Sequence, residues 1–184
     1  MKEFKESGLV FQFSDGWDVY QLDQEADYRE KINRQIPGTR SVDFVGFNEV
    51  SRVLLLVEVK GFRGYGDRRN WQRLTGEKDD LTIEIAQKVR DSLATMIGGA
   101  RCSTNLREVW RKNIAHLLRE GNLKVVAWVE LDVSTVVRLG RAKINMGIKQ
   151  AELRKRLTWL TSDVQILNTC NYQGEIEGMQ VCRV

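Results

Sequence analysis

Three charged side chains interrupt a part of the chain that is otherwise apolar. The apolar run Val53–Val57 is followed directly by Glu58, and Lys60 comes two residues later. Asp43 lies upstream, inside another apolar segment. A buried carboxylate or ammonium group is very costly unless it is paired with an opposite charge or binds a metal. These residues therefore predict either a plain salt bridge or a functional cleft.

The choice depends on whether Asp43 and Glu58 share a face of the sheet. Side chains alternate across a strand, so Glu58 and Lys60 project together. Segments 42–47 and 53–60 are joined by a short connection and predict an antiparallel hairpin. If the numbers of paired residues add up to 101, Asp43 lies opposite Glu58; if they add up to 100, Asp43 points to the other face. The sequence does not fix this register.

Two carboxylates that converge repel each other unless they share a proton or a cation. Oxygen ligands without histidine or cysteine favour a hard ion, Mg²⁺ above all, or Mn²⁺. Such an ion lowers the pKa of a water molecule and neutralises charge that develops on phosphorus. Lys60 could orient that water, help to deprotonate it or stabilise the transition state. This set of groups predicts Mg²⁺-dependent hydrolysis of phosphodiester bonds by a metal-activated water.

The surrounding pattern predicts an α/β fold. The predicted elements are a hairpin at 9–22, a helix at 23–35, strands at 42–47 and 53–60, helices at 80–97 and 104–120, a strand at 123–131, a helix at 146–160, a strand at 164–167 and a small hairpin around Gly174. Gly98-Gly99 is expected to stop the first long helix. Strands that are apolar on both faces are usually covered by helices on both sides. We therefore expect a mixed central sheet flanked by helices, in a single domain over 1–184 with its core at about 17–168 and a C-terminal hairpin or tail at 169–184.

Composition adds weaker constraints. The chain has 184 residues, a net charge of +4 and a pI near 9.0, which permits a polyanionic partner without requiring one. No apolar run approaches the roughly 18 residues of a membrane span. The N-terminus does not resemble a secretory signal, and the three cysteines have no metal-type spacing, so a reducing cytoplasm is expected. His116 is expected to be structural, and packing in or near the core is expected for Trp17, Trp110, Trp128 and Trp159.

The arrangement Asp43 … Glu58-Val59-Lys60 on a strand hairpin resembles the PD-(D/E)xK nuclease superfamily. The resemblance implies a restriction-endonuclease-like core of αβββαβ order. It also implies that Asp43 and Glu58 bind Mg²⁺ or Mn²⁺, that the Val59 carbonyl is a further ligand, and that Lys60 is the catalytic lysine. The proline that precedes the aspartate in the superfamily is replaced here by Val42.

Further site residues follow from the resemblance alone. Some members carry a glutamate on the first helix, for which Glu30 or Glu25 could serve. Some use a glutamine on the helix after the lysine, and Gln87, the neighbour of Lys88, is the candidate. Gln87 falls off the apolar face of its helix, so a solvated polar position is the alternative.

Segment 61–78 is rich in glycine, arginine and aromatic residues. Arginine suits phosphate contacts and aromatic rings stack on bases, so a nucleic-acid-binding loop is expected, with a solvated surface loop as the alternative. Its candidate contacts are Arg63, Arg68, Arg69, Trp71 and Arg73. The leading interpretation is a nuclease acting on nucleic acid, with DNA favoured and no membrane partner. A catalytically inactive nuclease-like module that binds nucleic acid or protein is the alternative, and a homodimer remains open.

Overall fold

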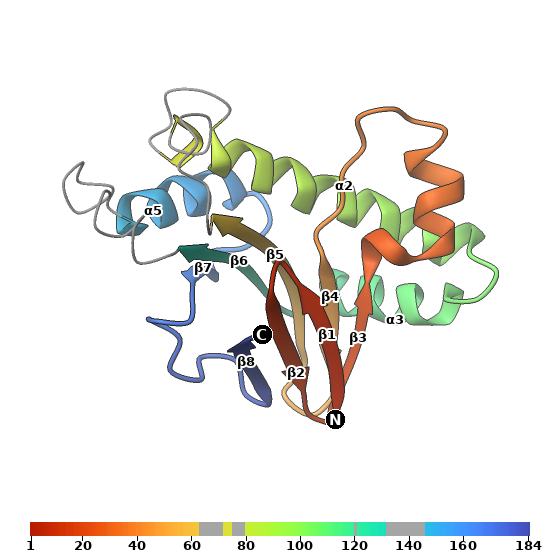
Figure 1. Cartoon of the computed structure of the whole chain (residues 1–184). Coiled ribbons are helices and arrows are strands. Elements are labelled where there is room, and N and C mark those ends of the chain that lie inside the picture. The colour runs from red at the N-terminus through yellow and green to blue at the C-terminus, as the bar shows by residue number, and fades with distance from the viewer. Residues whose placement is uncertain (63–71, 75–79, 120, 132–145) are drawn as a thin grey trace.

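A five-stranded sheet forms the centre of the molecule (Figure 1). The structure is a computed structural model, and it describes residues 1–62, 72–74, 80–119, 121–131 and 146–184. In spatial order the strands of the sheet are Trp17–Gln21 (β3), Phe44–Asn48 (β4), Val53–Phe62 (β5), Asn122–Leu131 (β6) and Val164–Leu167 (β7). β4 is antiparallel to both of its neighbours, β3 and β5, whereas β5, β6 and β7 run parallel. The prediction of a mixed sheet in an α/β fold is confirmed.

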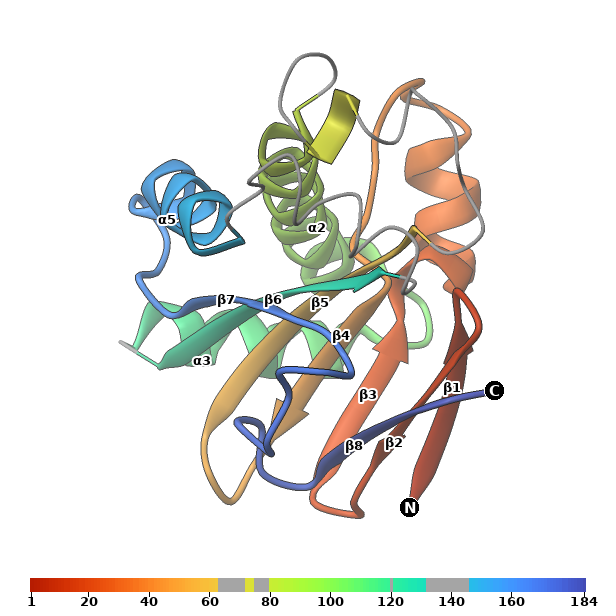
Figure 2. The same ribbon diagram turned by 60° about the vertical axis from the view of Figure 1, so that its left-hand side comes forward.

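Helices cover one face of this sheet (Figure 2). They are Leu81–Cys102 (α2), Arg107–Leu118 (α3) and Met146–Leu157 (α5), and two short helices, Leu22–Gln24 (η1) and Asp27–Asn33 (η2), separate β3 from β4. Ile85 and Val89 of α2 and Leu153 of α5 pack with Leu54 and Leu56 of β5 in one buried cluster. None of the helices described combines the length and the apolar character that a membrane crossing requires.

A small antiparallel sheet covers the opposite face. Its strands are Lys2–Glu6 (β1), Leu9–Phe13 (β2) and Met179–Arg183 (β8), in the order β1-β2-β8. The ring of Phe11 lies 5.1 Å from that of Phe44 and 5.4 Å from that of Trp128, between ring centroids. The expectation of helices on both sides is therefore wrong for this face, because aromatic side chains of a second sheet bury it.

The small sheet also corrects the predicted hairpin at 9–22. β2 and β3 belong to different sheets, and β2 instead pairs with β1 across a turn at Ser7 and Gly8, whose φ angles are 51° and 70°. Likewise β8 pairs with β2 and not with a hairpin partner around Gly174. Alternating apolar residues identify a strand, but they do not specify the partner of that strand.

Glu130, near the end of β6, fastens the C-terminal segment to the central sheet. Its side chain is 1% exposed. One oxygen accepts hydrogen bonds from Trp128 Nε1 and Thr169 N, each at 3.1 Å. The other accepts from Thr169 Oγ1 at 2.7 Å and from Arg183 at 2.6 and 3.1 Å. Although burial raises the pKa of Glu130, these hydrogen bonds lower it below its usual value.

Two further predictions about the helical layer are wrong. α2 continues past Gly98-Gly99 to Cys102. A Cβ added at Gly99 would lie 2.4 Å from Trp110 Cδ1, so this glycine permits close packing of α2 against α3 and does not end the helix. Trp17, Trp110 and Trp128 are buried as predicted. Trp159, however, is 61% exposed, because it follows the last turn of α5 at the surface.

The turn between β4 and β5 is well defined. Asn48 Oδ1 accepts hydrogen bonds from the backbone N–H groups of Val50 and Ser51, each at 3.0 Å. Arg52 closes the turn in the left-handed region with φ 50°. The turn aligns the two strands so that Phe44 lies opposite Val57, a pair whose numbers add up to 101.

Candidate functional site

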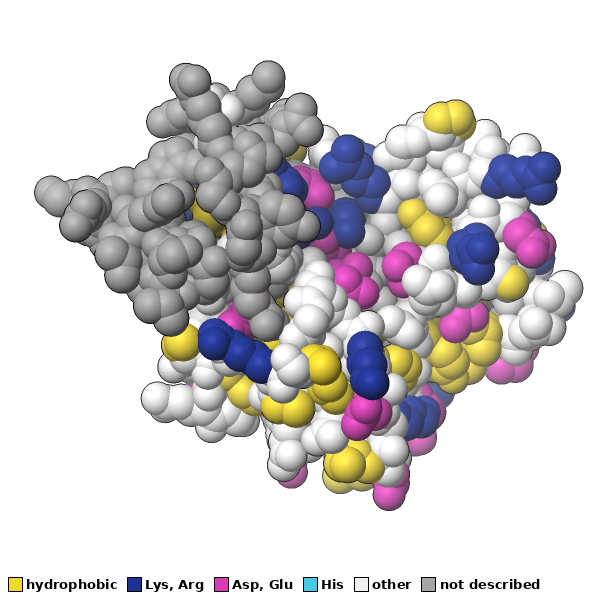
Figure 3. Space-filling model, in the orientation of Figure 1, with side chains coloured by type: hydrophobic (Ala, Val, Ile, Leu, Met, Phe, Trp, Pro, Cys, Tyr) yellow, Lys and Arg dark blue, Asp and Glu magenta, His cyan; other side chains and the backbone are white. Residues whose placement is uncertain are grey.

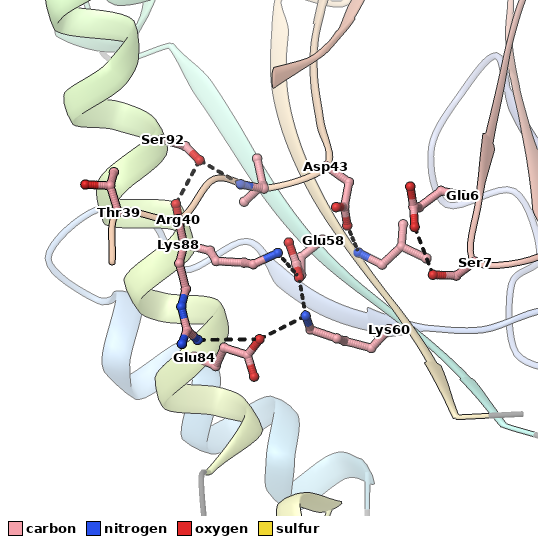
Figure 4. A network of polar contacts seen from close by, with 12 residues as sticks. Glu6, Ser7, Thr39, Arg40, Asp43, Glu58, Lys60, Glu84, Lys88 and Ser92 are labelled. Atoms are coloured by element: carbon pink, nitrogen blue, oxygen red, sulfur yellow. Dashed lines mark hydrogen bonds and ion pairs between the residues drawn. The ribbon is translucent and has the colours of Figure 1, made fainter. Parts of the chain in front are cut away.

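This register brings Asp43 next to Glu58. Asp43 comes one residue before β4, at the position opposite Glu58. Its Oδ2 accepts a hydrogen bond from the Val59 N–H at 2.6 Å. Both carboxylates approach the same end of β5 (Figure 4). The alternative register, in which Asp43 would point away, is excluded.

The backbone around Asp43 is held from two sides. The N–H of Val42 donates to Ser92 Oγ on α2 at 2.9 Å, and the N–H of Leu22 donates to the Asp43 carbonyl at 3.2 Å. The segment that precedes β4 therefore lies against α2, and β5 continues beyond the point where β4 begins. β4 therefore does not pair with β5 at Val59, and the side chain of Asp43 accepts the hydrogen bond from the Val59 N–H instead.

Glu58 is buried among cations. Its side chain is fully buried, and Oε1 lies 2.7 Å from Lys60 Nζ and 2.6 Å from Lys88 Nζ. Oε2 has no hydrogen-bond partner among the residues that the structure describes. The plain salt bridge expected for Glu58 and Lys60 is thus present, but it involves only one of the two carboxylate oxygens.

Lys60 joins Glu58 to a second carboxylate, that of Glu84 on α2. Lys60 Nζ lies 2.9 Å from Glu84 Oε1. Although burial lowers the pKa of Lys60, Glu58 and Glu84 raise it above its usual value. Conversely, burial raises the pKa of Glu84, but Lys60 and Arg73 lower it below the usual range. Lys60 is therefore an ammonium ion and Glu84 a carboxylate at neutral pH.

Asp43 has the opposite electrostatic character. Desolvation and the charge of Glu58 raise its pKa from 3.8 to about 7, against the lowering effects of Lys88 and the Val59 N–H. When burial and a like charge raise the pKa of a carboxyl group, a cation that replaces the proton stabilises the ionised form of that group. Such perturbed groups gather at functional sites more often than elsewhere.

A polar pocket of about 340 Å³ opens onto Asp43 and Lys88. The remaining lining comes from η1, η2 and the segment before β4: Asp23, Tyr28, Asn33, Thr39, Arg40 and Ser41. On the face shown in Figure 3, acidic and basic side chains lie intermingled near the centre of the molecule. A solute can therefore reach Asp43 and Lys88 from the side of η2, whereas Glu58 lies buried behind them.

The oxygen atoms present are of the chemical kind that a hard divalent cation prefers. Asp43, the unpartnered Oε2 of Glu58 and a main-chain oxygen are available. The Val59 carbonyl points toward Asp43, because the N–H and C=O of a strand residue face the same neighbour. No group of three or more His, Cys, Asp or Glu side chains that could hold a metal occurs among the described residues. Mg²⁺ does not require one, since one or two carboxylates with waters and substrate phosphates usually bind it.

Lys88 and Glu84 are site residues that the sequence interpretation missed. They lie four residues apart, beside the apolar stripe of Ile85 and Val89, so they share a face of α2 that borders the sheet. Gln87 is exposed and lines a groove with Arg90 instead, and the structure does not bring it to the carboxylates. The helical periodicity could have identified Glu84 and Lys88.

The other sequence candidates lie elsewhere. Glu30 is exposed on η2, and Glu25 lines an apolar pocket with Trp110. Arg73 forms an ion pair with Glu84, and its guanidinium carbon lies 5.9 Å from the centroid of the Phe62 ring. The other proposed nucleic-acid contacts lie outside the described residues: Arg63, Arg68, Arg69 and Trp71. His116 is buried with its ring against Phe47, as expected of a structural histidine.

No known protein-family model, curated protein or solved structure matches this chain. The function is therefore inferred from the geometry of the site and from the chemistry of its residues.

Proposed function

We propose that the protein is a Mg²⁺-dependent nuclease of the PD-(D/E)xK type, acting on phosphodiester bonds, with DNA as the favoured substrate and Mn²⁺ as an alternative cofactor. The observation that carries the proposal is that one oxygen of Glu58, Oε2, has no hydrogen-bond partner among the described residues. This carboxylate is 1% exposed, has Asp43 at its side, and yet leaves Oε2 without a hydrogen bond from the described residues. A purely structural carboxylate is expected to have both oxygens satisfied.

In this proposal Asp43, Glu58 and the Val59 carbonyl hold the cation. Bound Mg²⁺ supplies positive charge to the phosphate oxygens and lowers the pKa of a water molecule. The raised pKa of Lys60 favours a role as a cationic donor that orients the water or stabilises charge in the transition state, rather than a role as general base. Glu84 keeps the ammonium group of Lys60 in place, and Lys88 positions Glu58.

The element order gives partial support for a restriction-endonuclease-like core. The helix η2, the hairpin β4–β5, the helix α2 and, after the additional helix α3, the strand β6 come in the same sequence as in the expected αβββαβ order. β3 completes three antiparallel strands, but it precedes η2 instead of following it. We propose this core as a variant arrangement, with cleavage products that carry 5′-phosphates and a site of action in the cytoplasm.

A nuclease-like module that binds without cutting is the second candidate. It is favoured by the second ammonium group on Glu58 Oε1, since Lys60 and Lys88 together neutralise the carboxylate without any metal. In such a module the charged cluster would serve only to hold α2 on the sheet. The two candidates differ in one property, because only the nuclease gains activity from a divalent cation.

The test is cleavage of plasmid DNA and of single-stranded DNA by the full chain with Mg²⁺, Mn²⁺ or EDTA. We expect metal-dependent cleavage that Glu58→Ala abolishes. The matched control is Glu49→Ala, at the opposite end of the same hairpin, where the side chain is 73% exposed. Cleavage that persists in EDTA and in Glu58→Ala would refute the assignment of the site. Tight binding without cleavage by the wild type would favour the second candidate.

A further inference from the structure

A second hollow lies on the outer side of α2, between this helix and the end of α5. It has a volume of about 360 Å³ and is lined by Ile83, Ala86, Gln87, Arg90, Arg156 and Trp159. α2 separates it from the pocket at Asp43, which Lys88 of the same helix lines. Ile83, Gln87 and Arg90 occupy the helix positions next to Glu84, Lys88 and Asp91, which face the site and the segment that leads to β4.

Trp159 is the unusual side chain of this groove. It is 61% exposed, whereas Trp17, Trp110 and Trp128 are each at most 2% exposed. Large aromatic side chains contribute most when they are buried, so an open indole ring beside a groove is a marker of an interaction site. Ile83, 41% exposed, adds apolar surface next to it.

Two arginines line the same groove as the ring, and each has an acidic partner. Arg156 Nε donates to Thr82 Oγ1 at 2.9 Å, and its Nη2 lies 3.5 Å from Asp80 Oδ2. Arg90 Nη2 lies 2.8 Å from Asp91 Oδ1. These carboxylates weaken the positive field but hold the guanidinium groups in place, and a fixed guanidinium loses less entropy when it binds a phosphate.

An aromatic ring and arginines in the same groove match single-stranded nucleic acid. Bases stack on aromatic side chains by about 1–3 kcal/mol each, and arginine contacts the phosphates between them. In a duplex the base faces are already stacked on one another, so an open ring favours a single strand. A second copy of the chain is the competing occupant, but a stable self-interface needs about 800 Å² from each partner and a more apolar centre than a groove with two arginines.

We propose that the groove between α2 and α5 binds single-stranded nucleic acid, with one base stacked on Trp159 and the adjoining phosphates near Arg90 and Arg156. This inference deepens the proposed function by naming the form of the substrate, and it rests on that function only for the cleavage step. A strand that leaves the groove would reach the pocket at Asp43 by crossing over α2, whose Lys88 lines that pocket. The groove would thus hold the substrate on one side of the scissile bond.

The experiment is fluorescence anisotropy of a labelled dT12 oligonucleotide with the full chain in EDTA, so that no cleavage occurs. We expect Trp159→Ala to weaken binding about tenfold, Trp159→Phe to weaken it less, and Arg90→Ala to weaken it by about threefold with a flatter salt dependence. Arg101→Ala, an exposed position in the last turn of the same helix, is the control and should bind like the wild type. Circular dichroism establishes that each variant is folded.

An abasic oligonucleotide of equal length and charge separates stacking from charge. The proposal requires Trp159→Ala to affect dT12 several-fold more than the abasic strand. Equal losses on both strands, or no loss on either, would overturn it. So would sedimentation showing a wild-type dimer that Trp159→Ala converts into a monomer of unchanged affinity for dT12. Failure of the nuclease proposal gives a different pattern, since the wild type would then not cleave, or cleavage would persist in Glu58→Ala, whatever the binding in EDTA.

Discussion

Glu58 and Glu130 lie on neighbouring strands, and both are 1% exposed, yet their surroundings are opposite. Both oxygens of Glu130 accept hydrogen bonds, from neutral donors and one arginine. These donors lie on β6, on β8 and in the segment that follows β7. Glu58 faces two ammonium groups through one oxygen and leaves the other without a hydrogen bond among the described residues. The comparison teaches that burial of a carboxylate does not by itself indicate chemistry. The informative property is whether its coordination is complete.

The largest expected difference concerns activity. Glu58→Gln should reduce metal-dependent cleavage at least about a thousandfold, because the loss of one ligand charge weakens both the binding of the cation and the stabilisation of the transition state. Glu130→Gln should leave the turnover of folded protein within about threefold of wild type, since it lies on the other face of the sheet. Rates of plasmid cleavage, normalised to folded protein, measure both. Equal losses in the two variants would abolish the distinction.

Stability should show the reverse order. Glu130→Gln should lower the free energy of unfolding by about 3 kcal/mol, since the charge that Arg183 pairs with is removed and the amide cannot accept all the bonds. Glu58→Gln without metal should cost less, because it also removes the repulsion between Glu58 and Asp43, and Lys60 keeps Glu84 as a partner. Urea denaturation at pH 7.5 gives both values. A larger loss for Glu58→Gln would identify Glu58 as the structural carboxylate.

Asp43 sharpens the comparison through pH. Its pKa in the folded protein, about 7, exceeds the usual 3.8, so the folded state binds more protons and this group's contribution to stability falls as pH rises between about 4 and 7. Asp43→Asn should therefore raise stability at pH 8 by roughly 2 kcal/mol without metal. Glu130 has a lowered pKa, so its stabilisation is lost only in acid, as pH falls through that lowered value. Unfolding curves between pH 4 and 8 compare them, and a flat wild-type profile in that window would contradict the assignment for Asp43.

The smallest effect should be stabilisation by the cation itself. Mg²⁺ at about ten times its dissociation constant should raise the melting temperature by about 2–5 °C. The shift should grow from pH 6 to pH 8, because the proton on Asp43 competes with the metal. Glu58→Gln should lose the shift and Glu130→Gln should keep it. A shift that survives in Glu58→Gln would place the cation elsewhere.

The sequence predicted the part of the site that depends on local patterns. The apolar run Val53–Val57 correctly identified the buried strand, and β5 carries Glu58 and Lys60 beyond the end of its pairing with β4. The choice between two registers required the structure, because both give plausible strands. Gln87 was named as a candidate only through a resemblance, whereas helical spacing alone would have indicated Glu84 and Lys88.

What the sequence could not predict comes from distant segments. Donors that satisfy Glu130 come from residues far along the chain, such as Thr169 and Arg183, so nothing near position 130 distinguishes it from position 58. The partner of β2 likewise arrives from β8 at the other end of the chain. Gly99 was interpreted as a helix stop because its role depends on Trp110, which belongs to another helix.

The turn after β4 has a consequence for how the site could be altered. Asn48 and Arg52 fix its length, and that length alone decides which residue stands across from Glu58. Inserting a single amino acid there would slide one strand past the other by one step and rotate Asp43 to the aromatic side of the sheet, without changing any charged residue. The spacing of this remote loop is therefore as much a determinant of the chemistry as the carboxylates themselves.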